Sequence, residues 1–205
     1  MGYSRIEKIH STANTAHSQS CFAIGFADES CFPLCIRDCN GASVMSMIGK
    51  FLQISADDLE SLIQQPEAVH SYLFPEDGEF PDCLDVDRAW HGLDYLLGGE
   101  SWDGEGAGAA AKAVLGGTEI GDDLGYGPVR YLTVAQVKEV ADAISQIGRE
   151  ELARRFDAQA MAKAGIYAFD LQDTDLEHFA LYYEELKRYY EDAAKNGNAM
   201  LLFLA

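Results

Sequence analysis

Basic residues are scarce in this chain. It has 15 Lys and Arg against 34 Asp and Glu, which gives a formal net charge of −19 over 205 residues. Residues 1–44 carry 3 cations and 4 acids, a net of −1, whereas residues 45–205 carry 12 and 30, a net of −18. So acidic a surface repels phosphate, and we expect neither nucleic acid nor an anionic membrane as a partner. It would attract a basic protein, although acidity can also serve solubility alone.

Long apolar runs and a secretory signal are also missing. The longest apolar stretch, 199–205, has seven residues, whereas a membrane-spanning helix needs roughly 18. The apolar segment 21–27 is too short for the core of a signal peptide, and Asp28 and Glu29 follow it directly. The chain has five cysteines, an odd number, which favours free thiols. Together these absences predict a soluble protein of the reducing cytoplasm.

Three of the cysteines, Cys31, Cys35 and Cys39, are spaced by four residues and would share one face of a helix. Pro33 argues against a helix there, and structural zinc sites usually pair their cysteines in separate knuckles. We therefore expect no metal and no cofactor.

Regular patterning begins near Met45. The preceding residues include a polar, aperiodic stretch over 10–21, so we expect residues 1–44 to be a poorly ordered leader or an over-long start. Residues 45–205 show no internal repeat and no linker, which predicts a single domain. Its strands and helices do not alternate as βαβ units, so we predict an α+β fold with a small sheet of about three strands covered by five or six helices.

The predicted elements follow from periodicity and capping. Strands are expected over 47–54, 129–132 and 200–204, the last being apolar enough for a central position. Capping boxes are expected at Ser55, Thr133 and Thr174, each opening a helix. The segment 86–97 is predicted to be a helix whose buried stripe includes Trp90. Short helices are expected over 109–115 and 149–156, and residues 74–83 form an acidic loop.

Several segments of the domain match a known pattern. These are MSMIG at 45–49, LDVDRAWHGLDYLL at 84–97, AVLG at 113–116, GYGPVRYLT at 125–133 and YYEELKRYY at 182–190. In these motifs and their order the chain resembles the YfbM-like family, small bacterial proteins of unknown function. The resemblance implies an α+β fold beginning near Met45, and it implies no reaction. The chain departs from the family pattern at Asp94 and Gly98, where histidine and threonine are usual, which weakens any catalytic interpretation of that helix.

One candidate site lies on the predicted helix 86–97. Asp87, His91 and Asp94 stand at i, i+4 and i+7, so they share a stripe beside the apolar face. A carboxylate–His–carboxylate stripe can bind a ligand or orient a general base. It can equally be a surface stripe in which two acids stabilise a histidine.

A second group surrounds the turn 125–128. Tyr126, Arg130 and Tyr131 flank it, and Arg130 can clamp a ligand carboxylate or pair with an acid of the chain itself. The glycine-rich segment 104–112 resembles a phosphate loop only faintly, because no strand precedes it and two acids lie within or beside it.

Two classes of function remain open. The first is an acidic protein-binding domain, for instance an inhibitor or immunity-type partner of a basic protein, and the absence of a catalytic signature favours it. The tyrosines Tyr182 and Tyr189, at the edge of the last helix's apolar stripe, are candidate contacts. The second is an enzyme or small-molecule binder with a cleft near Asp87, His91, Asp94 and Arg130. Carboxylates gathered on one surface would support the first, and a pocket with convergent side chains the second. The sequence does not indicate an oligomeric state.

Overall fold

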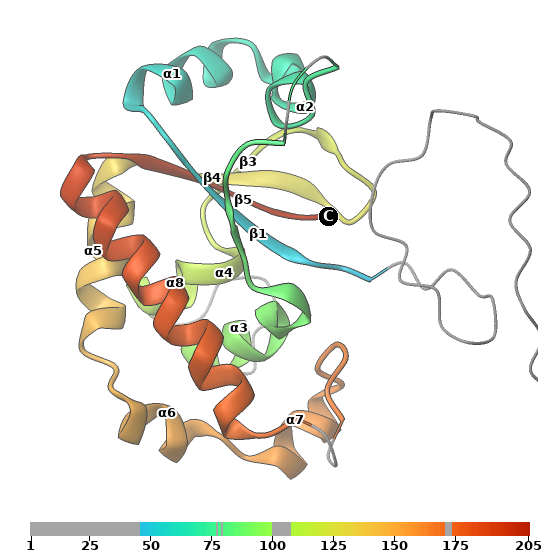
Figure 1. Ribbon diagram of the computed structural model, residues 1–205, viewed down its shortest axis with the longest axis vertical. Coiled ribbons are helices and arrows are strands. Elements are labelled where there is room, and N and C mark those ends of the chain that lie inside the picture. The colour runs from blue at the N-terminus through green and yellow to red at the C-terminus, as the bar shows by residue number, and fades with distance from the viewer. Residues whose placement is uncertain (1–45, 77, 79, 100–107, 171–173) are drawn as a thin grey trace, which may run out of the picture. The chain divides into compact units, whose positions relative to one another are not determined.

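The computed structural model describes residues 46–76, 78, 80–99, 108–170 and 174–205. The leader expected over 1–44, its three spaced cysteines and the glycine-rich residues 104–107 lie outside the described residues. The described part forms an α+β domain with a five-stranded antiparallel sheet (Figure 1). Its strands are β1 (Gly49–Ile54), β2 (Leu84–Asp85), β3 (Thr118–Asp123), β4 (Pro128–Leu132) and β5 (Ala199–Leu204).

The described residues also form eight α-helices and three short 3₁₀ turns. The α-helices are α1 (Ala56–Gln64), α2 (Val69–Leu73), α3 (Trp90–Gly98), α4 (Lys112–Leu115), α5 (Val134–Ser145), α6 (Arg149–Arg155), α7 (Ala158–Ala164) and α8 (Leu176–Asn196). The 3₁₀ turns are η1 (Pro66–Ala68), η2 (Asp87–Ala89) and η3 (Ala109–Ala111). The expected fold class is confirmed, but the counts of about three strands and five or six helices were too low.

The sheet has the strand order β2-β1-β5-β4-β3, so β5 is central, as its apolar sequence predicts. β5 pairs with β1 from Gly49↔Leu204 to Ile54↔Ala199 and with β4 from Arg130↔Leu202 to Leu132↔Met200. Because side chains alternate along a strand, Met200 and Leu202 face one side of the sheet and Leu201 and Phe203 the other.

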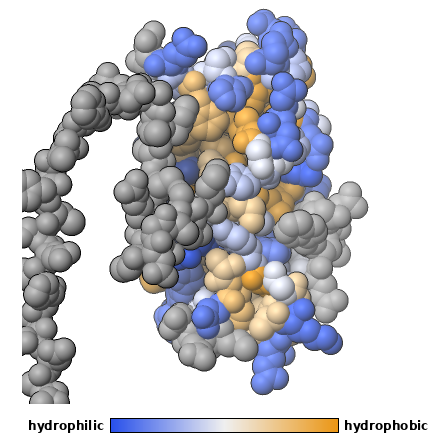
Figure 2. Space-filling view, turned by 90° about the vertical axis from the view of Figure 1, so that its right-hand side faces the viewer, coloured by the Kyte–Doolittle hydropathy of each residue, from blue (hydrophilic) through white to orange (hydrophobic). Residues whose placement is uncertain are grey.

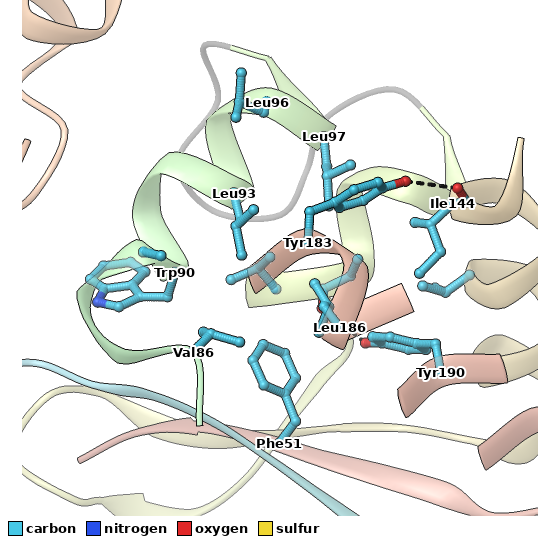
Figure 3. Close-up of a cluster of buried hydrophobic side chains, with 14 of the residues drawn as sticks. Phe51, Val86, Trp90, Leu93, Leu96, Leu97, Ile144, Tyr183, Leu186 and Tyr190 are labelled. Carbon is cyan, nitrogen blue, oxygen red and sulfur yellow. Dashed lines mark hydrogen bonds between the residues drawn. The ribbon is translucent and has the colours of Figure 1, made fainter. Parts of the chain in front are cut away.

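Helices cover both faces of the sheet. Figure 1 places α1 and α2 on one side and α3, α4, α5 and α8 on the other. The larger core lies on the second side, and Figure 3 shows Leu93, Tyr183 and Leu186 gathered there above Phe51, with Trp90 at one end of the cluster. Each such buried side chain contributes about 1.5–3 kcal/mol of hydrophobic free energy. A smaller core under α1 and α2 holds Leu201 and Phe203.

Local signals explain several helix boundaries. The Ser55 hydroxyl accepts a hydrogen bond from the N–H of Asp58, and Thr133 and Gln136 form a complete capping box at α5. The cap expected at Thr174 was wrong by one residue. Asp175 is the N-cap of α8, and its carboxylate accepts a hydrogen bond from the N–H of His178. α8 ends at Gly197, which adopts the left-handed conformation with φ +70°.

The helix expected over 86–97 begins later than predicted. Asp87 has a positive φ of 49°, which an α-helix does not allow, so η2 precedes α3 and α3 starts at Trp90. As predicted, Trp90 is buried, with 1% of its surface exposed. No helix in the described ranges is long and apolar enough to cross a membrane.

Candidate functional site

The structure separates the three residues of the predicted stripe. Asp87 lies in η2, and its side chain is 44% exposed beside the guanidinium of Arg88. His91 and Asp94 lie in α3 and are only 6% and 1% exposed. They belong to the packed side of the domain, so the three residues do not form an open carboxylate–His–carboxylate surface.

His91 is fixed by its neighbours. Its Nδ1 accepts a hydrogen bond from the backbone N–H of Tyr167 at 2.8 Å, so that nitrogen must be unprotonated. Its ring stacks on Trp90 with the ring centroids 5.0 Å apart. Burial lowers the pKa of His91, because the charged imidazolium is poorly solvated there. These contacts give His91 a role in joining α3 to the segment that contains Tyr167.

Trp90 and Tyr167 also bind the backbone of Met47, just before β1. Trp90 Nε1 donates to the backbone carbonyl of Met47 at 3.0 Å, and the N–H of Met47 donates to the Tyr167 hydroxyl at 3.0 Å. The rings of Trp90 and Tyr167 stack at 5.9 Å between centroids. Two side chains thus satisfy both backbone groups of Met47 just before β1 begins.

The second predicted group divides between the two faces of the sheet. Arg130 and Tyr131 are neighbours on β4, so their side chains point in opposite directions. Tyr131 packs against the smaller core under α1 and α2. Arg130 lies on the other face and pairs with Glu119 of β3, Nη2 to Oε1, at 2.7 Å. Its Nη1 also donates to the carbonyl of Gly117 at 3.4 Å. Pairing within the chain was one of the two roles expected for Arg130.

A hollow of about 210 Å³ lies beside Arg130. Tyr126 and Arg130 line it together with apolar side chains of α4 and β5, whereas Asp87, His91 and Asp94 are absent from its described lining. Of the four residues around which a cleft was predicted, this hollow therefore includes only Arg130. Figure 2 views the side of the molecule where β5 ends and the β3–β4 turn lies, and apolar patches alternate there with hydrophilic ones.

A different arrangement gathers around Tyr182 on α8. The side chain is half-buried, and burial together with the carboxylates of Asp87, Asp85 and Glu185 raises the pKa of its phenol, although the nearby guanidinium of Arg88 acts in the opposite direction. His178, one helical turn earlier, meets the Tyr182 ring edge-on with 5.3 Å between centroids. Leu181 beside it is 69% exposed. We call Asp85, Asp87, His178, Leu181, Tyr182 and Glu185 the acidic tyrosine surface.

Sequence reasoning identified only part of this surface. The seven-residue repeat of tyrosines in α8 correctly places Tyr183 and Tyr190 in the core and Tyr182 and Tyr189 at its edge. The approach of Asp85 and Asp87 to α8 has no local signal in the sequence, because β2 and η2 are distant from α8 along the chain and meet it only in the folded structure. Acids were expected in a stripe on one helix, and the structure instead brings acids of β2, η2 and α8 together.

The described residues include no group of three or more His, Cys, Asp or Glu side chains arranged to hold a metal ion. Cys83, the one cysteine that the structure describes, is half-buried on the loop before β2. Burial raises the pKa of its thiol, so the site does not favour a thiolate.

Comparison with known proteins agrees with the family resemblance and the fold. Residues 45–203 match the family model described as "Domain of unknown function (DUF1877)". The fold is similar to the crystal structure of YfbM from Escherichia coli, a protein of unknown function, with a TM-score of 0.61 and 23% sequence identity. That match covers 78% of this chain and 100% of the other. No curated protein sequence matches the chain.

Proposed function

The chain belongs to the YfbM-like family of domains of unknown function (DUF1877), and from its own surface chemistry we propose that it is a protein-binding domain. Its partner is a basic protein, which it contacts through the acidic tyrosine surface. The role we propose is of the inhibitor or immunity type, in which the acidic domain covers a basic face of its partner. The observation that carries this proposal is the approach of β2 and η2 to α8, which brings the carboxylates of Asp85 and Asp87 near Tyr182 and Glu185 of α8.

The charge balance supports a cationic partner. Residues 45–205 carry 30 acids and 12 cations. Within the described residues, seven of those cations already form ion pairs with acids of the same chain: Lys50, Arg88, Arg130, Lys138, Arg149, Arg154 and Arg155. Most of the positive charge of residues 45–205 is therefore locally compensated, and the surplus is negative. Such a surface steers basic proteins toward it and slows encounter with acidic ones.

Tyr182 supplies a suitable anchor. Tyrosine is common among the residues that dominate binding energy, because its ring gives a large contact area at a low entropic cost. His178 restricts the ring from one edge, so part of its conformational freedom is already lost before binding. The exposed Leu181 adds apolar area beside it. A basic partner that offers an apolar contact between its Lys or Arg residues would match this arrangement.

The experiment is affinity capture from the native host followed by binding measurements on the captured basic protein. The test variant combines Asp87→Asn, Tyr182→Ala and Glu185→Gln. Asn is well suited to position 87, because Asp87 has a positive φ and Asn tolerates that conformation. The control combines Glu60→Gln and Asp122→Asn. It removes the same number of negative charges, two, but from exposed sites on α1 and β3.

The proposal predicts that the native chain and the control bind the basic protein with equal affinity, within about twofold. The test variant should bind about 100-fold more weakly, as expected when a hot-spot tyrosine and two steering charges are lost. Equal binding by the test variant and the control would contradict the proposed surface. Recovery of no basic protein would contradict the proposed class of partner.

A further inference from the structure

We propose that the hollow between β4 and β5 binds a small apolar carboxylic acid, of the aromatic or branched-chain kind, whose carboxylate pairs with Arg130. None of the residues lining the hollow belongs to the acidic tyrosine surface. The inference therefore stands or falls separately from the docking of a protein.

The hollow arises from the way in which two strands part. β4 and β5 pair from Leu132↔Met200 to Arg130↔Leu202, and the same register would next bring Pro128 opposite Leu204. Proline has no N–H and cannot donate to the neighbouring strand. The ladder ends there, and the residues beyond its end, Gly127 and Pro128 on one strand and Phe203 and Leu204 on the other, line the hollow.

The remaining lining suits an apolar ligand body. Val114 and Leu115 of α4, Leu202 of β5 and Trp90 of α3 contribute to it. Ligand sites combine such apolar walls with a few polar groups that fix orientation. The volume, about 210 Å³, is below the roughly 300–1,000 Å³ of pockets for drug-sized molecules. A ligand with a single ring or a short branched chain fits that size.

Arg130 supplies the charge that selects a carboxylate. Among the described lining residues, it alone carries a formal charge. Its side chain is 26% exposed, whereas its partner Glu119 is 59% exposed. An ion pair with so exposed a partner contributes only about 0–1 kcal/mol, so a ligand can displace Glu119 at little cost. A carboxylate within the hollow would be less hydrated than Glu119 and would bind the guanidinium more strongly.

The same features disfavour other ligands. A polyanion such as a nucleotide would meet one arginine in a domain of net charge −18. A neutral ligand would leave the guanidinium paired with Glu119 and would gain only the apolar contacts. Tyr126, half-exposed at the hollow, adds a phenol that can donate a hydrogen bond to a bound carboxylate.

The test titrates the full chain with sodium benzoate and with isovalerate, and uses benzamide as the neutral analogue of benzoate. Binding is followed by saturation-transfer NMR and by the fluorescence of Trp90 in a Trp102→Phe background. Arg130→Met removes the cation and keeps the apolar stem, and Glu119→Gln removes the competing carboxylate. Arg149→Met and Glu177→Gln alter another exposed ion pair of the same type and serve as matched controls.

We expect at least one of the two acids to bind saturably and benzamide to bind at least tenfold more weakly than benzoate. Arg130→Met should weaken binding at least tenfold, Glu119→Gln should strengthen it about threefold to tenfold, and the controls should leave it unchanged. Equal binding by the native chain and Arg130→Met, or by benzoate and benzamide, would overturn the proposal. If Arg130→Met fails to fold, the affinity of Glu119→Gln for the acid tests the proposal instead. An affinity no higher than that of the native chain would overturn the proposal.

Discussion

The backbone N–H of Tyr167 donates to Nδ1 of His91 across 76 positions of sequence, at 2.8 Å. This bond requires an unprotonated Nδ1, and it lies in a buried stack with Trp90. His91 therefore acts here as an acceptor that joins α3 to the segment before α8.

Acid should weaken the domain through His91. The pKa of His91 is lowered in the folded state, so between that value and about 6.5 the unfolded chain binds a proton that the folded chain does not. The free energy of unfolding therefore rises with pH across this window. The contribution of His91 is fully present above about pH 6.5 and is lost as the pH falls toward its folded-state pKa. Chemical denaturation of the native chain and His91→Gln at pH 7.5 and 5.5 measures the effect.

The pH-dependent loss should be smaller in His91→Gln than in the native chain. His70→Gln, a substitution at an exposed position of α2, is the control and should retain the native pH dependence. If His91→Gln and the native chain lost the same free energy between the two pH values, this account of His91 would be wrong.

Trp90→Ala should lower the free energy of unfolding by about 3–5 kcal/mol, as for other large-to-small core substitutions. Trp90 is 1% exposed and packs with Leu93 and Val86 in the larger core (Figure 3). Trp90→Phe keeps most of the apolar contact but loses the hydrogen bond to Met47, so it should cost less. Urea denaturation provides both values, and a loss below about 1 kcal/mol in Trp90→Ala would contradict the packing.

Gly92→Ala should destabilise the domain even though alanine is the better helix former. A Cβ at position 92 would lie 2.1 Å from Cε1 of Phe179, so the α3–α8 contact must open. Such overpacking costs about 1–3 kcal/mol, which exceeds the gain of up to about 1 kcal/mol in helix propensity. Gly148→Ala is the control, because no atom lies within 4 Å of its added Cβ. Thermal melts should show a lower midpoint for Gly92→Ala alone, and equal midpoints would refute the close contact.

A chain that begins at Met45 should keep the thermal midpoint of the full chain within about 5 °C, a difference equivalent to roughly 1–2.5 kcal/mol for a domain of this size. The reason is that the described core draws on residues from Met47 onward, and Met47 is itself held by Trp90 and Tyr167. Differential scanning calorimetry of the two chains makes the comparison. Loss of cooperative unfolding in the shorter chain would show that residues 1–44 belong to the domain.

The sequence predicted the elements that have strong local signals. β5 is apolar throughout and central, the capping box predicted at Thr133 is present, and the stripe that includes Trp90 is buried. β2 and β3 were not expected. β2 has only two residues and exists through its pairing with β1. β3 is a polar edge strand with a single fully buried residue, Ile120, so it shows no alternating pattern.

The candidate site was harder to predict than the fold. Reasoning from an amphipathic helix places His91 and Asp94 beside the apolar stripe, but seven of the nine residues of α3 are buried. A helix covered on most sides has no reliable polar face in its sequence. The hollow depends on where the β4–β5 ladder ends, and the acidic tyrosine surface on the approach of β2 and η2 to α8. Both are non-local, and only the residues Asp87, Tyr126, Arg130 and Tyr182 were indicated beforehand.

The most direct test of the proposed function measures association kinetics between this chain and its captured basic partner at low and high salt. Attraction between the acidic tyrosine surface and the partner is screened over about 8 Å at physiological ionic strength. The association rate should therefore fall about tenfold or more as salt increases, while the dissociation rate changes little. The variant with Asp87→Asn and Glu185→Gln should show a shallower salt dependence than the control with Glu60→Gln and Asp122→Asn. An association rate independent of salt would contradict electrostatic docking.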